Sequence, residues 1–202
     1  MYPPTPRNGP ISAELAGYVA GYQRSGDLGK LLDELRAFAE RTDADFLAAA
    51  SKPFQGMPEV VIPLYERITA ERPGDAQAMV ILANAYWLAG RGPDTVSHLA
   101  SKAKEIDPSN RGAWHLWALA ESSVRKRVDR WLEVTKRFPR DQLARAALAD
   151  NATSLATDED DPVALKLAIE TYESLLAESP PTAQRLALEE TLKALRHGTR
   201  DT

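Results

Sequence analysis

Apolar residues recur along this chain at the three- and four-residue spacing that marks one face of an α-helix. The spacing is clearest in residues 76–108, where Met79, Leu82 and Tyr86 share a face and Gly90 ends the stretch. A second apolar stripe follows in the same segment: Val96, Leu99, Ala100 and Ala103. Because alanines allow two helix backbones to approach closely, the pattern predicts an antiparallel helix pair.

Neighbouring segments repeat this pattern, and each ends at a proline. The prolines are Pro73, Pro108, Pro139 and Pro180, which lie 35, 31 and 41 residues apart. One helix pair cannot bury its apolar face alone, so a period of roughly 34 residues predicts a stack of pairs. We expect one repeat domain over residues 11–197. Its predicted parts are a degenerate unit at 12–43, units at about 44–73, 76–108, 111–139 and 142–180, and a capping helix at 182–196. Residues 1–10 are expected to form a flexible leader and residues 198–202 a disordered tail.

Short polar residues precede several of these predicted helices, as expected of N-terminal caps. The predicted caps are Asp27, Asp75, Ser109, Asp141 and Asp161. The last of them is followed by Pro162, a residue that suits the first turn of a helix. No alternating run is long enough to predict a sheet, so the expected fold class is all-α.

The order of large, small and aromatic positions in residues 76–108 resembles the tetratricopeptide repeat, with Met79 in place of the usual tryptophan and one extra residue near Gly92. The resemblance covers residues 76–180 and, with less detail, residues 12–73. It implies a right-handed α-α superhelix of about ten to eleven antiparallel helices, whose first helices line a concave groove. Members of this family usually act as adaptors that hold a peptide or helix of another protein.

The resemblance places a set of side chains in that groove. They are Gln77, Val80, Ile81, Asn84, Trp87, His115, Leu119 and Asp150. An apolar centre with a few hydrogen-bonding groups suits a partner helix or an apolar peptide. Trp87 has two interpretations, because it could anchor a partner or pack against the adjacent repeat. Some family members grip a C-terminal carboxylate, but only Asn84 fits that pattern here, since the other expected basic positions hold Ala, Leu or Gly.

Basic residues dominate the segment between residues 125 and 140, where Val128 and Trp131 keep a separate apolar face. The predicted basic ridge comprises Arg125, Lys126, Arg130, Lys136 and Arg137. A solvated helix face, a surface for an acidic protein and a nucleic-acid surface all remain open. The acidic run at 158–161 lacks the alternation of a calcium-binding EF-hand loop, and we interpret it as a solvated loop.

Composition narrows the functional classes. The 202 residues are 44% hydrophobic and 27% charged, as in an ordinary globular protein, and a net charge of -4 disfavours nucleic acid as a partner. With no cysteine, the chain has no disulfide framework and no cysteine zinc site, which favours a cytoplasmic location. No apolar run approaches the eighteen residues of a membrane span, and the first residues do not resemble a signal peptide.

The sequence shows no nucleophile paired with a base and no glycine-rich phosphate loop in the right context. Its histidines, His98, His115 and His197, are too scattered for a zinc site. We therefore expect a non-enzymatic scaffold with no catalytic residue, metal or cofactor, which binds a protein or peptide partner. Two alternatives remain, namely self-association into a homo-oligomer and a role as an accessory or regulatory subunit of an enzyme complex. Any hydrolytic site would depend on Asn84, His115 and Asp150.

Overall fold

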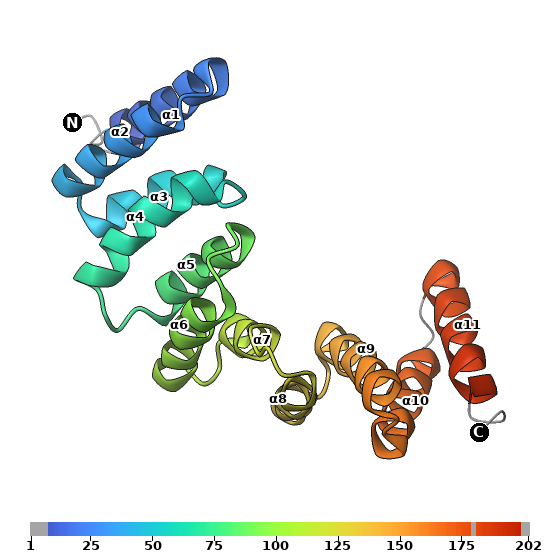
Figure 1. Cartoon of the computed structure of the whole chain (residues 1–202). Helices are drawn as coiled ribbons and strands as arrows, with labels where there is room; N and C mark the ends of the chain where they lie inside the picture. The colour runs from blue at the N-terminus through green and yellow to red at the C-terminus, as the bar shows by residue number, and fades with distance from the viewer. Residues whose placement is uncertain (1–7, 179–180, 199–202) are drawn as a thin grey trace, which may run out of the picture. The chain divides into compact units, whose positions relative to one another are not determined.

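The structure is a computed structural model that describes residues 8–178 and 181–198 of the chain. Within these residues it contains eleven α-helices and one short 3-10 helix, joined by brief turns (Figure 1). In chain order they are α1 (Asn8–Ser25), α2 (Leu28–Arg41), α3 (Ala44–Ser51), η1 (Lys52–Phe54), α4 (Pro58–Glu71), α5 (Ala76–Leu88), α6 (Pro93–Ile106), α7 (Arg111–Leu119), α8 (Val124–Arg137), α9 (Gln142–Glu159), α10 (Pro162–Ala177) and α11 (Thr182–Gly198). The all-α fold class expected from the sequence is confirmed.

Contacts divide the chain into two compact units, Met1–Trp117 and Ala118–Thr202, with the boundary inside α7. The single repeat domain expected over residues 11–197 stays a prediction, because this boundary falls within the run of helix pairs. Helix α1 begins at Asn8, inside the segment expected to be a leader. Residues 1–7, 179–180 and 199–202 lie outside the described part of the chain, as do the expectations that concern them.

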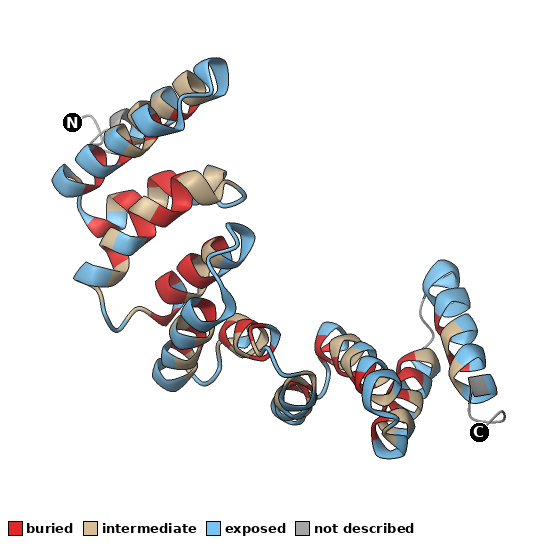
Figure 2. Cartoon of the chain, viewed as in Figure 1, coloured by how far each residue is buried: buried red, intermediate tan, exposed pale blue. Residues whose placement is uncertain are grey.

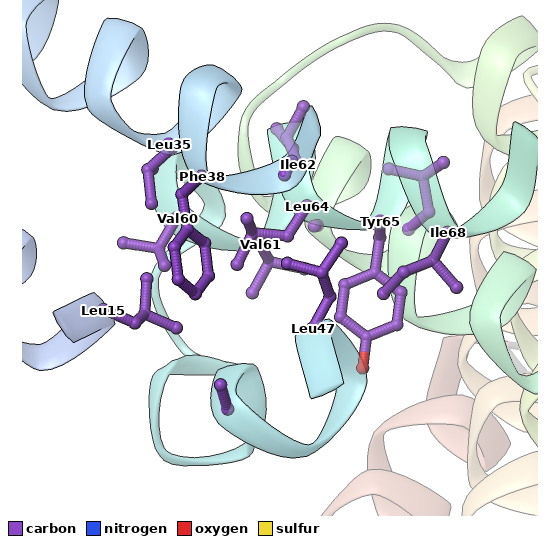
Figure 3. Packing of buried hydrophobic residues seen from close by; sticks show 14 of the residues in the cluster. Leu15, Leu35, Phe38, Leu47, Val60, Val61, Ile62, Leu64, Tyr65 and Ile68 are labelled. Carbon is purple, nitrogen blue, oxygen red and sulfur yellow. The ribbon is translucent and has the colours of Figure 1, made fainter. Parts of the chain in front are cut away.

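In the first unit, α1 packs against α2 and α3, α4 packs against α2, α3 and α5, and α5 packs against α6. The faces that meet are the buried ones in Figure 2, and the largest cluster of buried side chains joins α1 to α5. Figure 3 shows its centre, where the Phe38 ring from α2 lies among Leu15, Val60 and Val61. Apolar side chains of several helix pairs thus fill one continuous core, as the stacking of repeats requires.

Side-chain caps fix where most helices start. Asp75 accepts a hydrogen bond of 2.9 Å from the Ala78 N–H, and Asp161 accepts bonds from the N–H groups of Val163 and Ala164 at 2.9 and 3.0 Å. Asp27 and Asp141 act in the same way. Ser109 was the wrong residue for α7, because the Asn110 side chain accepts the hydrogen bond from the Ala113 N–H, while Ser109 itself bonds to Asp107.

The turn between α5 and α6 requires glycine. Gly90 and Gly92 have φ angles of 66° and 90°, in the region that residues with a Cβ atom rarely adopt. The extra residue seen near Gly92 in the sequence therefore belongs to this turn and leaves the two helices regular.

In the second unit, α8 packs against α9, α9 against α10, and α10 against α11. Its buried side chains include Trp131 from α8, Leu148 from α9 and Tyr172 from α10. Helices α9 and α10 are 18 and 16 residues long, against 13 and 14 for α5 and α6, which accounts for the wide interval before Pro180.

Candidate partner-binding surface

Helix α5 holds five of the predicted groove residues, namely Gln77, Val80, Ile81, Asn84 and Trp87. Gln77, Ile81, Asn84 and Leu88 follow each other at spacings of four, three and four residues, so they form one stripe along the helix. Gln77 and Asn84 are exposed and Ile81 is half-buried. Trp87 lies beside this stripe and is 40% exposed, while Leu88 is 55% exposed. The end of α5 therefore presents two large apolar side chains to solvent.

Two of the predicted groove residues are largely used for packing. Ile81 packs against the main core of the first unit. Val80 packs against a smaller cluster with Ala113, and it lies so close to α7 that a Cβ atom at Gly112 would be 3.0 Å from its Cγ1. Both side chains therefore contribute to repeat stacking more than to an open surface.

The other predicted groove residues are divided between the units. His115 on α7 is half-buried and belongs to the first unit, whereas Leu119 and Asp150 belong to the second. The Asp150 carboxylate accepts a hydrogen bond of 2.6 Å from the Tyr172 hydroxyl. Burial and this carboxylate raise the pKa of Tyr172 to about 12. Asp150 thus fastens α9 to α10, and the structure gives it a structural partner that the sequence did not suggest.

Gln77 also makes a contact between repeats. Its Oε1 accepts a hydrogen bond of 3.1 Å from the Asn110 side chain, which caps α7. The same region holds an aromatic contact, since the rings of Trp114 and Trp117 meet edge to face at 5.7 Å and the Lys104 ammonium lies 3.5 Å from the Trp117 centroid. Gln77 thus connects α5 to the start of α7, and Lys104 connects α6 to α7.

The predicted basic ridge lies on α8, and part of it is neutralised by acidic residues of the same unit. Arg125 pairs with Glu159 at 2.6 Å and with Asp161 at 2.9 Å. Arg130 pairs with Glu121 at 2.7 Å. The basic ridge and the acidic run at 158–161, two separate features in the sequence, therefore meet in space. This run is not the loop expected from the sequence, because Asp158 and Glu159 belong to the last turn of α9. Lys126, Lys136 and Arg137 are the exposed remainder of the ridge.

The pairing of Asp161 with Arg125 leads to a prediction about how the stability of the second unit depends on pH. Backbone hydrogen bonds and the Arg125 pair hold the pKa of Asp161 below its ordinary value of about 4. A carboxylate with a depressed pKa in the folded state adds stability above its unfolded pKa, and this stability is lost as the pH falls through the folded pKa. We expect the Tm of the parent to fall between pH 5 and pH 2 more steeply than that of Asp161→Asn, which can still cap α10 but cannot titrate. Thermal melts followed by circular dichroism measure both slopes, and equal slopes would contradict this role of Asp161.

A groove in the first unit lies outside the predicted sites. It has a volume of about 630 Å³ and runs between α4, α5 and α6, and its polar lining includes Glu66, Asp94, His98 and Lys102. The Met79, Leu82 and Tyr86 face of the repeat pattern forms its floor, but no sequence motif brings Glu66 of α4 and Lys102 of α6 to the same cavity. Within the described residues there is no cluster of acidic and histidine side chains that could hold a metal ion, and no helix long and apolar enough to cross a membrane.

Comparison with solved structures defines the fold. A MamA protein is similar with a TM-score of 0.58 and 14% identity, over 86% of this chain and 98% of that chain. A tetratricopeptide repeat protein from Parabacteroides merdae has a TM-score of 0.57 and 17% identity, over 95% of this chain and 75% of that chain. A thermophilic tetratricopeptide repeat protein from Thermus thermophilus has a TM-score of 0.54 and 16% identity, over 92% of this chain and 98% of that chain.

The chain therefore has the tetratricopeptide repeat fold, with its helices packed in sequential order as in the solved structures. The resemblance inferred from the Met79, Leu82 and Tyr86 pattern is confirmed at the level of fold. No protein-family model and no curated protein sequence matches the chain. This fold commonly serves as a protein-interaction scaffold and is typically not catalytic.

Proposed function

We propose that this protein is a non-enzymatic scaffold that binds a peptide or helix of another protein against the exposed face of α5. The observation that carries the proposal is the exposure of Trp87 and Leu88, which lie beside the hydrogen-bonding side chains of Asn84 and Gln77. Tryptophan is a frequent anchor of protein interfaces, and exposed apolar patches rimmed by polar residues mark interaction sites. Of the two interpretations of Trp87, we favour the partner anchor.

A cavity next to this face supports the proposal. Leu88 lines an apolar pocket of about 350 Å³ together with Leu28 and Leu32 of α2 and Ile62 of α4. Glu59 and Arg91 complete its wall with opposite charges. A pocket of this size holds one or two apolar side chains, so a segment that crosses the end of α5 could insert an anchor there.

The test compares the parent with a Trp87→Ala and Leu88→Ala double variant in affinity capture from the source cell. Truncation of central anchors typically costs about 2 kcal/mol or more each, so we expect the double variant to recover at least about tenfold less partner. Val163→Ala is the matched control, because Val163 on α10 is 76% exposed and lies outside the proposed surface. Ile81→Ala is unsuitable, since Ile81 packs against the core.

Recovery of the same partners at the same yield would contradict the proposal. Light scattering over a range of concentrations tests the alternative of self-association. A mass that rises with concentration in the parent and not in the double variant would assign the α5 face to contacts between copies. The cytoplasmic location and the absence of catalysis remain part of the proposal.

A further inference from the structure

The groove between α4 and α6 lies on the side of α5 opposite the proposed partner face. Its floor consists of Met79, Leu82 and Tyr86 from α5, with Leu99 from α6. Met79 and Leu82 are buried, so Tyr86 and Leu99 are the accessible apolar part of this floor. Tyr86 follows Gln77 by nine residues, which is about 180° around the helix. An occupant of this groove would therefore contact a different surface from a partner bound at Trp87.

One end of the groove is acidic. The Tyr86 hydroxyl donates a hydrogen bond of 2.7 Å to Glu66 of α4, which holds this carboxylate at the groove wall. Burial and the same carboxylate raise the pKa of Tyr86 to about 12, so the phenol stays a donor at neutral pH. Asp94 lies in the first turn of α6, directly after the turn that leaves the end of α5. Glu66 and Asp94 therefore lie at the end of the groove where α5 finishes.

The other end is basic. Lys102 is eight residues beyond Asp94 on α6, which is about 12 Å along the helix axis. Met79 near the start of α5 packs with Ala103 and Leu99, which places Lys102 level with the beginning of α5. His98 lines the wall between the two ends, and Asp94, His98 and Lys102 are all exposed.

We propose that this groove is a second docking site, which binds an amphipathic helix from a partner protein. The apolar floor receives the apolar face of that helix, Glu66 and Asp94 receive a basic side chain, and Lys102 receives an acidic one. Two helices wall the groove over about 12 Å, and two turns of a bound helix span this distance. Opposite charges at the ends of one apolar channel select a segment with the complementary charges. The site is independent of the Trp87 face.

The test uses three fluorescein-labelled synthetic peptides with blocked ends and one shared helical apolar stripe. They differ at two positions eight residues apart, which hold Lys and Glu, Lys and Lys, or Glu and Glu. Fluorescence anisotropy measures their binding to the full chain. Because one exposed ion pair changes affinity by up to about fivefold, we expect the parent to prefer the Lys and Glu peptide by about three- to fivefold.

Lys102→Glu makes both ends of the groove acidic, so we expect this variant to prefer the Lys and Lys peptide. The matched control is Lys52→Glu, which changes the net charge equally at an exposed position outside the groove. Ala70 is an exposed residue of the groove wall, and Ala70→Trp should fill the channel and weaken all three peptides.

Several results would overturn the proposal. The first is that no peptide binds to the parent. The second is that Lys102→Glu prefers the same peptide as the parent, and the third is that Ala70→Trp binds the peptides as well as the parent does. Loss of peptide binding in the Trp87→Ala and Leu88→Ala double variant would place the peptide on the other face and would also overturn it. A concentration-dependent mass that Ala70→Trp abolishes would show that a second copy of the chain, and not a partner protein, occupies the groove. Failure of the Trp87 proposal alone leaves all of these expectations unchanged.

Discussion

Replacing Phe38 with alanine is expected to lower the free energy of unfolding of the first unit by about 3 to 5 kcal/mol. The Phe38 ring is 0% exposed and packs at the centre of the main core, where it meets the Tyr18 ring edge to face at 6.0 Å. Truncation removes the transfer free energy of the ring and leaves a cavity that several helices border. Urea unfolding followed by circular dichroism measures the loss.

Leu28→Ala is the control for Phe38→Ala. Leu28 is the first residue of the same helix but is 43% exposed, so its truncation should cost at most about 1 kcal/mol. The contrast separates burial from any general sensitivity of α2. Equal midpoints for the two variants would show that the Phe38 ring does not contribute to the core as the structure places it.

The sequence predicted the helix pairs well wherever local signals agreed. In α5, the apolar spacing of Met79, Leu82 and Tyr86 coincides with the Asp75 cap and the Gly90 turn. Each signal acts over a few residues, so one sequence suffices to detect it. The cap of α7 shows the limit of such local signals, because it is Asn110 and not the predicted Ser109. Both residue types are good caps, and only the geometry of the turn selects one of them.

The candidate surfaces were harder to predict, because they depend on pairs of residues far apart in the chain. The family resemblance placed Val80 in a groove, but Val80 packs with Ala113 of α7 and lies close to Gly112. The pairing of Arg125 with Asp161 connects residues 36 positions apart, which no local pattern reveals. The groove between α4 and α6 requires Glu66 and Lys102 to line the same cavity, and that follows only from the stacking of three helices.

Trp87 illustrates the same limit within a single helix. Its neighbour Tyr86 lines the groove between α4 and α6 and donates a hydrogen bond to Glu66. The two aromatic residues therefore face different surfaces. Neighbouring residues on a helix point about 100° apart, so both rings could not enter one core. The exposure of Trp87, however, depends on which side chains the next repeat brings close, and the sequence left this open.

The second stability prediction concerns Trp131 of the second unit. Trp131 is 4% exposed and shares the buried face of α8 with Val128 and Val134, on a helix that packs against α9. We expect Trp131→Ala to lower the free energy of unfolding of the second unit by about 3 to 5 kcal/mol. Trp131→Phe retains an aromatic ring and should cost less.

Trp87→Ala is the matched comparison, because the same substitution at a 40% exposed position leaves no enclosed cavity and should cost about 1 kcal/mol or less. Thermal melts followed by circular dichroism compare the three variants with the parent. A similar cost for Trp131→Ala and Trp87→Ala would contradict the different burial of the two rings. If the stability costs differ as expected and only Trp87→Ala reduces partner capture, then Trp131 stabilises the fold and Trp87 binds the partner. This division is expected because a ring that fills the core is not accessible to a partner.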